Sequence, residues 1–137
     1  MASRKAVTRE TLASLHILLV EDDPPTSELF KVVLECTGAL VSMAGSAEQA
    51  LRLLDRVLPD VLVSDIAMSH RDGFWLIGQV RNRPAEQGGT VPAIAVTAGD
   101  YRHDRVLAAG FHVCLSKPID PEVLCEAIAG VALKRVA

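Results

Sequence analysis

The chain has 137 residues, of which half are hydrophobic and only 4% are aromatic, and its formal net charge is −3. This length suffices for one domain with a core of its own and is too short for two. The small negative charge argues against direct binding to nucleic acid or to an anionic membrane. No apolar run approaches the roughly 20 residues that a membrane-spanning helix needs, so we expect no membrane segment.

Residues 1–14 carry three basic side chains but no apolar segment that ends in a cleavage site. This argues against a secretory signal, so we interpret them as an N-terminal extension to a domain at residues 15–137. The three cysteines, Cys36, Cys114 and Cys125, lie far apart and without Cys-x-x-Cys spacing. They are typical of reduced, buried thiols in a cytoplasmic protein rather than of a disulfide framework or a zinc site.

From residue 15 onward, short apolar runs alternate with amphipathic stretches. The apolar runs predict five strands, at residues 16–20, 40–43, 60–64, 91–96 and 111–115. The first, third and fourth runs lack polar alternation over most of their length. This is typical of strands that are covered on both faces of a parallel sheet.

The stretches between these runs carry helix signals. Ser46 and Gln49 form a capping box, and Asp120 followed by Pro121 is a second start signal. The remaining helices are expected to begin at Pro24 and to cover residues 74–83 and 100–109, and Gly38 and Gly110 stand where helix C-caps are expected. The five β-α units predict a doubly wound α/β fold in a single domain.

Polar residues stand at the carboxyl ends of four of the predicted strands. In chain order they are Glu21, Asp22 and Asp23 after the first strand, Asp65 after the third, Thr97 after the fourth and Lys117 beyond the fifth. Because the carboxyl ends of parallel strands meet at one edge of the sheet, where ligands bind in such folds, we expect these residues to form one site.

Two or three carboxylates from Glu21, Asp22 and Asp65 repel one another, and a single lysine cannot neutralise them. A hard divalent cation with oxygen ligands can, which indicates Mg²⁺, with Mn²⁺ as the alternative. A metal ion beside a carboxylate, a hydroxyl and an ammonium suits phosphoryl transfer. The ion and Lys117 balance charge, Thr97 donates to a phosphoryl oxygen, and a carboxylate is the nucleophile.

Each of these residues also has an ordinary interpretation. Asp22 or Asp23 alone is a typical N-cap before a proline, and Asp65 alone is a loop carboxylate. Thr97 alone is a strand-end hydroxyl, and Lys117 alone is a solvated charge. Their placement at four strand ends in order favours the joint interpretation.

With these residues in place, the chain resembles the response-regulator receiver domains from about residue 15 to residue 133. The matching segments are Ile17-Leu-Leu-Val-Glu-Asp-Asp23, Val63-Ser-Asp-Ile-Ala-Met68 with Asp72-Gly73, Ala95-Val-Thr-Ala98 and Leu115-Ser-Lys-Pro118. Each segment alone is a weak pattern, but the ordered set is specific. The resemblance implies a flavodoxin-like, doubly wound, five-stranded parallel sheet of strand order 2-1-3-4-5 with five helices.

The resemblance also implies a role for each matching residue. Asp65 corresponds to the residue that accepts a phosphoryl group from a histidine kinase or a histidine phosphotransfer protein. Glu21 and Asp22 correspond to the acidic pair, with Asp22 as the direct metal ligand beside Asp65, and the backbone carbonyl of Ala67 corresponds to a further ligand. Such a domain signals to an output partner, which the sequence does not identify, and catalyses only its own phosphorylation and dephosphorylation.

Two further residues acquire roles in the same way. Thr97 corresponds to the hydroxyl that follows the phosphoryl group, and Lys117 to the lysine that pairs with it. The bond between Lys117 and Pro118 is expected to be cis, as is usual in this family.

The chain departs from the family pattern at two positions. Cys114 stands where an aromatic residue is usual, and Ser69 stands where the loop after the acceptor often has proline. These departures leave open a pseudo-receiver, which would bind partners without being phosphorylated. An aspartyl-phosphate hydrolase of the haloacid-dehalogenase kind is a further alternative, but it requires a second aspartate at the position that Ala67 occupies.

Overall fold

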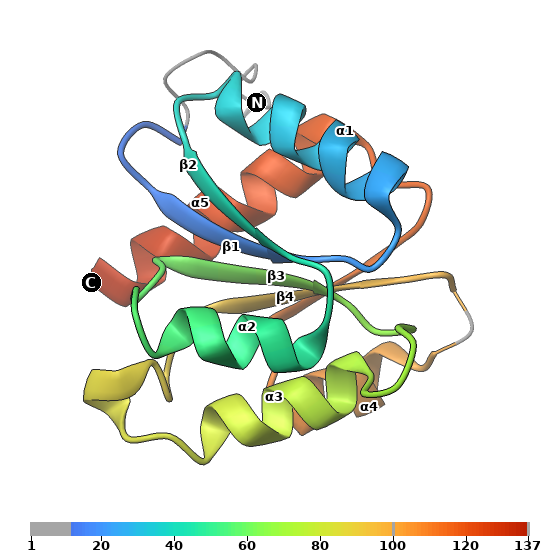
Figure 1. Cartoon of the computed structure of the whole chain (residues 1–137). Coiled ribbons are helices and arrows are strands. Elements are labelled where there is room, and N and C mark those ends of the chain that lie inside the picture. The colour runs from blue at the N-terminus through green and yellow to red at the C-terminus, as the bar shows by residue number, and fades with distance from the viewer. Residues whose placement is uncertain (1–11, 100, 137) are drawn as a thin grey trace.

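The computed structural model describes residues 12–99 and 101–136, with side chains up to residue 133, and shows a five-stranded parallel sheet between two layers of helices (Figure 1). The strands are β1 (His16–Val20), β2 (Leu40–Ala44), β3 (Val61–Asp65), β4 (Ala93–Thr97) and β5 (Val113–Ser116). The helices are α1 (Pro24–Glu35), α2 (Ala47–Leu54), α3 (Gly73–Arg81), α4 (His103–Ala109), α5 (Pro121–Val136) and the short 3-10 helix η1 (Ala85–Gln87), which was not predicted. The strand order β2-β1-β3-β4-β5 and the five α-helices confirm the predicted fold.

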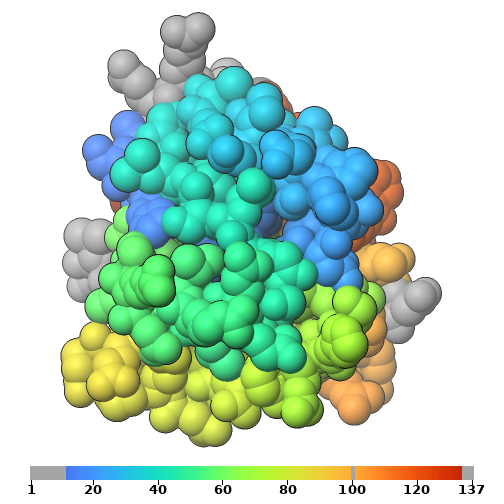
Figure 2. All heavy atoms as spheres, in the orientation of Figure 1, coloured from blue at the N-terminus to red at the C-terminus, as the bar shows by residue number. Residues whose placement is uncertain are grey.

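The core forms two layers, one on each face of the sheet. Helices α1 and α5 lie on one face, and α2, α3 and α4 lie on the other (Figure 1). Along β1, Leu18 and Val20 pack beneath α2, α3 and α4, whereas Ile17 and Leu19 pack beneath α1 and α5. Both sets of side chains are buried, which explains why the strand is apolar without alternation. In the same orientation, the atoms of α1, β2 and α2 lie in front and hide most of the other strands, and α3 lies along the lower rim (Figure 2).

Helices α1, α2 and α3 each begin after a residue whose side chain caps the helix. Asp23 caps α1 and accepts a hydrogen bond from the Thr26 amide at 3.2 Å. The expected capping box of α2 is partly present: the Ser46 hydroxyl accepts from the Gln49 amide at 3.1 Å, but the Gln49 side chain binds the amide of Gly45, not that of Ser46. Asp72 caps α3 in the same manner, which was not predicted although an aspartate before a glycine and an apolar stretch is a recognisable signal.

Three strands and one helix begin later than predicted, although β3 is displaced by a single residue, from 60–64 to Val61–Asp65. Strand β4 begins at Ala93 because Pro92 has no amide hydrogen to donate. At the start of β5, His112 donates its amide to the Ala93 carbonyl and accepts from the Ala93 amide through its ring, so a side chain replaces one strand bond. Helix α4 begins at His103 and has no side-chain cap at Arg102.

Arg81 joins three segments on the face of the sheet away from α1 and α5. Its guanidinium donates twice to the carbonyl of Gly110, at 3.0 and 2.7 Å, and once to the carbonyl of Gly89, at 3.0 Å. These bonds connect the end of α3 with the turn after α4 and with the segment that leads into β4. Burial lowers the pKa of Arg81.

Most of the expected N-terminal extension lies outside the described residues. Of its last residues, Leu12 is fully buried and its amide donates to the Thr37 carbonyl at 2.9 Å. The packed core therefore includes Leu12, and the domain boundary at residue 15 stays a prediction. Across the described part of the chain, no helix has the length and apolar character that crossing a bilayer requires.

The three cysteines are free, as predicted, but they are not all buried. Cys125 is buried and Cys114 is half-buried, whereas Cys36 is exposed. The prediction was wrong for Cys36 because this residue, the C-cap of α1, lies one turn beyond the exposed Val32, on the outer side of the helix.

Candidate functional site

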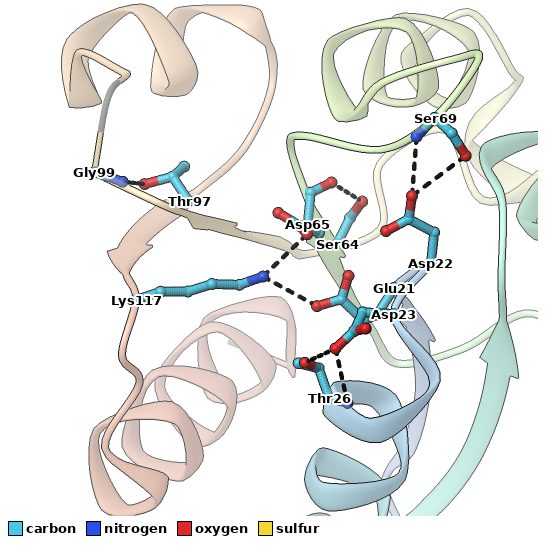
Figure 3. Close-up of polar contacts among 10 residues, drawn as sticks. All are labelled: Glu21, Asp22, Asp23, Thr26, Ser64, Asp65, Ser69, Thr97, Gly99 and Lys117. Carbon is cyan, nitrogen blue, oxygen red and sulfur yellow. Dashed lines mark hydrogen bonds and ion pairs between the residues drawn. The ribbon is translucent and has the colours of Figure 1, made fainter.

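At the carboxyl edge of the sheet, the ammonium group of one predicted residue binds the carboxylates of two others. Glu21 follows β1, Asp65 ends β3 and Lys117 follows β5. The Lys117 ammonium donates to Asp65 Oδ2 at 3.0 Å and to Glu21 Oε1 at 3.1 Å (Figure 3). The site therefore forms from residues at three strand ends, as the sheet topology predicts.

The three acidic residues after β1 have two different roles in the structure. Glu21, Asp22 and Asp65 each offer an oxygen atom, and these atoms lie within 4.8 Å of one another. Asp23 instead caps α1, where both the amide and the hydroxyl of Thr26 donate to it. The N-cap interpretation thus applies to Asp23, which leaves Glu21 and Asp22 for the site.

Glu21 is an unusual buried carboxylate. Its side chain is 2% exposed, and its Oε2 atom is buried without a hydrogen-bond partner among the described residues. Burial raises its pKa to about 7, and the neighbouring Asp65 adds to the rise while Lys117 opposes it. For Lys117, burial lowers the pKa, but the bonds to Asp65 and Glu21 outweigh it, and the net direction is upward.

The loop between β3 and α3 holds Asp65 at the edge of the sheet. The amide of Ile66 donates to the Val96 carbonyl at 3.1 Å, and the amide of Gly73 donates to the Ile66 carbonyl at 2.8 Å. A Cβ atom on Gly73 would lie 2.7 Å from the Asp65 carbonyl oxygen. Only glycine therefore allows α3 to begin this close to the end of β3.

Thr97 lies at the same edge but does not contact the carboxylates. Its hydroxyl accepts a hydrogen bond from the Gly99 amide at 3.4 Å and is turned away from Asp65 (Figure 3). Its carbonyl accepts from the Lys117 amide at 2.6 Å, which ties the lysine to β4. Burial raises the pKa of the neighbouring Cys114 thiol, and a hydrogen bond with Thr97 opposes the rise.

Two loop residues complete the surroundings. Ala67, whose carbonyl is the further expected ligand, is exposed two positions after Asp65. Ser69 donates its amide to Asp22 Oδ2 at 2.9 Å and its hydroxyl to the same atom at 3.4 Å. This link was not predicted, because it joins residues that are 47 positions apart and belong to no common motif.

The described residues fit a hard cation. The group offers only oxygen atoms, and its three carboxylates exceed the single positive charge of Lys117. In addition, Glu21 Oε2 has no hydrogen-bond partner in the part of the chain that the structure describes. Oxygen ligands and excess negative charge favour Mg²⁺ over softer metals. A buried, unpartnered carboxylate oxygen is costly unless a cation or a proton compensates it.

The family of the chain follows from comparison with known proteins. The model of the response regulator receiver domain family matches residues 17–129. The chain belongs to this family. Receiver domains act in two-component phosphorelay signalling, and the Lys117–Pro118 bond is cis, as expected from the resemblance.

The relatives of this receiver domain include response regulators and sensor histidine kinases. It is 51% identical over 114 residues to an uncharacterized 14.6 kDa protein in the sodA1 3′ region of Leptolyngbya boryana, covering 82% of this chain and 86% of that protein. It is 34% identical to the transcriptional regulatory protein TrcR of Mycobacterium tuberculosis, covering 85% of this chain and 45% of that protein. Other curated relatives are matched over 12 to 52% of their length.

Solved receiver domains share the fold closely. The receiver domain of a histidine kinase from Syntrophus aciditrophicus is 29% identical with a TM-score of 0.80, covering 88% of this chain and 92% of that one. The receiver domain of the sensor histidine kinase PA1611 from Pseudomonas aeruginosa is 30% identical with a TM-score of 0.79, covering 88% and 98%. The latter structure contains a magnesium ion coordinated in its active site cleft.

Proposed function

We propose that this receiver domain accepts a phosphoryl group on Asp65, in a Mg²⁺-dependent reaction, from a histidine kinase or a histidine phosphotransfer protein. One observation carries the proposal: the Lys117 ammonium binds Asp65 and Glu21 together, beside a buried Glu21 oxygen that has no partner among the described residues. This arrangement supplies a nucleophile and a fixed positive charge, and its excess of carboxylates favours the binding of a second positive charge.

The residues of the chain divide the chemistry among them. A carboxylate oxygen of Asp65 attacks the phosphorus atom, so that a P–O bond forms while the P–N bond to the donor histidine breaks. The electron pair of the broken bond stays on the imidazole ring, which takes up a proton. Lys117 is placed to bind an oxygen of the transferred group, and Thr97 must turn its hydroxyl from Gly99 to do the same.

The carboxylates of Glu21, Asp22 and Asp65 and the carbonyl of Ala67 would hold the metal ion, which is Mg²⁺ or alternatively Mn²⁺. When bound, the ion balances the negative charge of the phosphoryl oxygens. The PA1611 receiver domain, with its magnesium ion, supports this choice. The phosphorylated domain then signals to an output partner by a change of conformation.

Intact mass after incubation with Mg²⁺ and acetyl phosphate tests the proposal. We expect an adduct of one phosphoryl group that requires the metal and is absent from Asp65→Asn, because an amide is a far poorer nucleophile. Asp104→Asn changes an exposed aspartate on α4 and serves as the matched control, which should keep the adduct. An adduct that persists in Asp65→Asn would overturn the assignment, and its absence from the parent protein would favour a pseudo-receiver.

A further inference from the structure

Ser69 makes a contact that the proposed chemistry does not yet use. It lies in the loop between β3 and α3, and both of its donors point at one oxygen of Asp22, which follows β1 (Figure 3). The amide bond, at 2.9 Å, has normal length, whereas the hydroxyl bond, at 3.4 Å, is long. The amide is therefore the principal donor.

The loop presents these donors from a fixed position. At its start, the Ile66 amide is bonded to β4, and at its end Asp72 caps α3 while the Gly73 amide returns to the Ile66 carbonyl. His70, directly after Ser69, has a positive φ of 64° and turns the chain back toward α3. Because both ends are bonded, the orientation of Ser69 is determined by the sheet and by α3.

The contact occupies only one side of the Asp22 carboxylate. Within the described residues, Oδ2 receives both hydrogen bonds, and Figure 3 shows the other oxygen turned toward the side of Asp65. Asp22 is only half-buried and follows the last residue of β1 by two positions, so the backbone alone does not determine its rotamer. The two hydrogen bonds select the rotamer in which an oxygen faces Glu21 and Asp65.

We propose that Ser69 is a positioning residue that orients Asp22 for metal binding and thereby raises the affinity of this receiver domain for Mg²⁺. The inference rests on the proposed function, because it concerns the same metal site. Hydrogen bonds to a metal-binding carboxylate fix its direction before the ion arrives, and losing such a bond typically weakens metal binding by about 10- to 100-fold.

Substitutions at residue 69 distinguish the contribution of the amide from that of the hydroxyl. Ser69→Thr keeps both the amide and the hydroxyl, Ser69→Ala keeps only the amide, and Ser69→Pro removes both. His70→Gly is the matched loop control, since glycine adopts the positive φ of this position without cost and leaves both Ser69 donors intact. Should Ser69→Pro fail to fold, replacing the residue 69 amide by an ester, with Ser69→Ala as its reference, removes the N–H alone.

Calorimetric titration with Mg²⁺, without any phosphodonor, measures the effect directly. We expect Ser69→Thr and His70→Gly to bind as the parent does, Ser69→Ala to bind slightly more weakly, and Ser69→Pro or the ester to bind at least about tenfold more weakly. Thermal unfolding without metal should be the same for the parent and the ester, because the contact is at the surface.

Three results would overturn the inference. Parental affinity in Ser69→Pro, or in the ester where that variant does not fold, would show that the donors do not orient Asp22. An equal loss in His70→Gly would show that loop order matters and the hydrogen bonds do not. Absence of Mg²⁺ binding by the parent protein would overturn the proposed metal site itself, and this outcome is distinct from the other two.

Discussion

The ring of Tyr101 meets the ring of Phe74 edge to face, with their centroids 5.6 Å apart and their planes at 63°. Phe74 belongs to the first turn of α3, and Tyr101 belongs to the loop that connects Thr97 with α4. Both rings pack against the core layer beneath α2, α3 and α4. The contact therefore connects the loop after Thr97 with the helix that begins close to Asp65.

We predict that the response to phosphorylation stays local and follows this contact. Cys114 on β5 offers no large ring that could move. The conformational difference between the unphosphorylated and phosphorylated forms is therefore expected at residues 98–103 and at the start of α3. Amide chemical shifts with and without beryllofluoride and Mg²⁺ measure it. Tyr101→Leu should abolish the shifts near Phe74 but preserve those at Gly99. Large shifts through residues 111–115 and into α5 would contradict the prediction.

Gly73→Ala should destabilise the protein by about 1–3 kcal/mol, because the added methyl group would lie 2.7 Å from the Asp65 carbonyl oxygen and 2.8 Å from the Ile66 Cα atom. Gly78 lies on the same helix with open space around it. Its replacement by alanine is the matched control and should stabilise the helix by about 0.5–1 kcal/mol. Urea unfolding compares the two variants, and equal effects would argue against a close approach at Gly73.

The metal-free protein should lose stability as the pH rises through the range in which Glu21 ionises. The folded state holds the Glu21 proton up to about pH 7, whereas a glutamate ordinarily has a pKa of 4.5. The contribution is thus fully present below pH 4.5 and is lost as the pH passes 7, with a total on the order of 3 kcal/mol.

Unfolding of Glu21→Gln at several pH values checks this expectation. Its stability should depend less on pH than that of the parent, while Glu28→Gln, on the exposed side of α1, should follow the parent. Mg²⁺ should restore stability to the parent at pH 8, because it binds the folded state alone. Parallel pH curves for the parent and Glu21→Gln would contradict the assignment.

The three cysteines should react with iodoacetamide in the order of their exposure. Cys36 is exposed and should react first, followed by the half-buried Cys114, whose raised pKa reduces the thiolate fraction at neutral pH. Burial also raises the pKa of Cys125, and this residue should react only after unfolding. Peptide mass spectrometry after timed alkylation gives the order, with denatured protein as the control for full reactivity.

Sequence patterns predicted those parts of the site that depend on topology. Asp65 and Lys117 could be placed together because the ends of parallel strands share one edge. What the patterns could not supply is the direction of each side chain. They did not decide which of Asp22 and Asp23 caps α1, and they gave no sign that Ser69 binds Asp22, since these choices depend on the geometry of turns rather than on periodicity.

Sequence patterns also did not predict the exposure of Cys36 or the first residue of α4. Cys36 follows an apolar stretch, yet it lies at the end of α1 and faces solvent. Helix α4 lacks a side-chain cap, so its start was placed three residues too early. Strand β1, in contrast, was predicted correctly because burial on both faces leaves an unbroken apolar run.

Glu21 and Lys117 lie 96 positions apart in the chain. A ribosome therefore completes the acidic half of the site long before it adds the lysine, and β5, which brings the lysine in, pairs only with β4 at the edge of the sheet. A chain that is still being made, or one that has been cleaved before β5, holds the three carboxylates of the site without the Lys117 ammonium. Under the proposed function, the domain can therefore receive a phosphoryl group only after β5 has been synthesised and has joined the sheet.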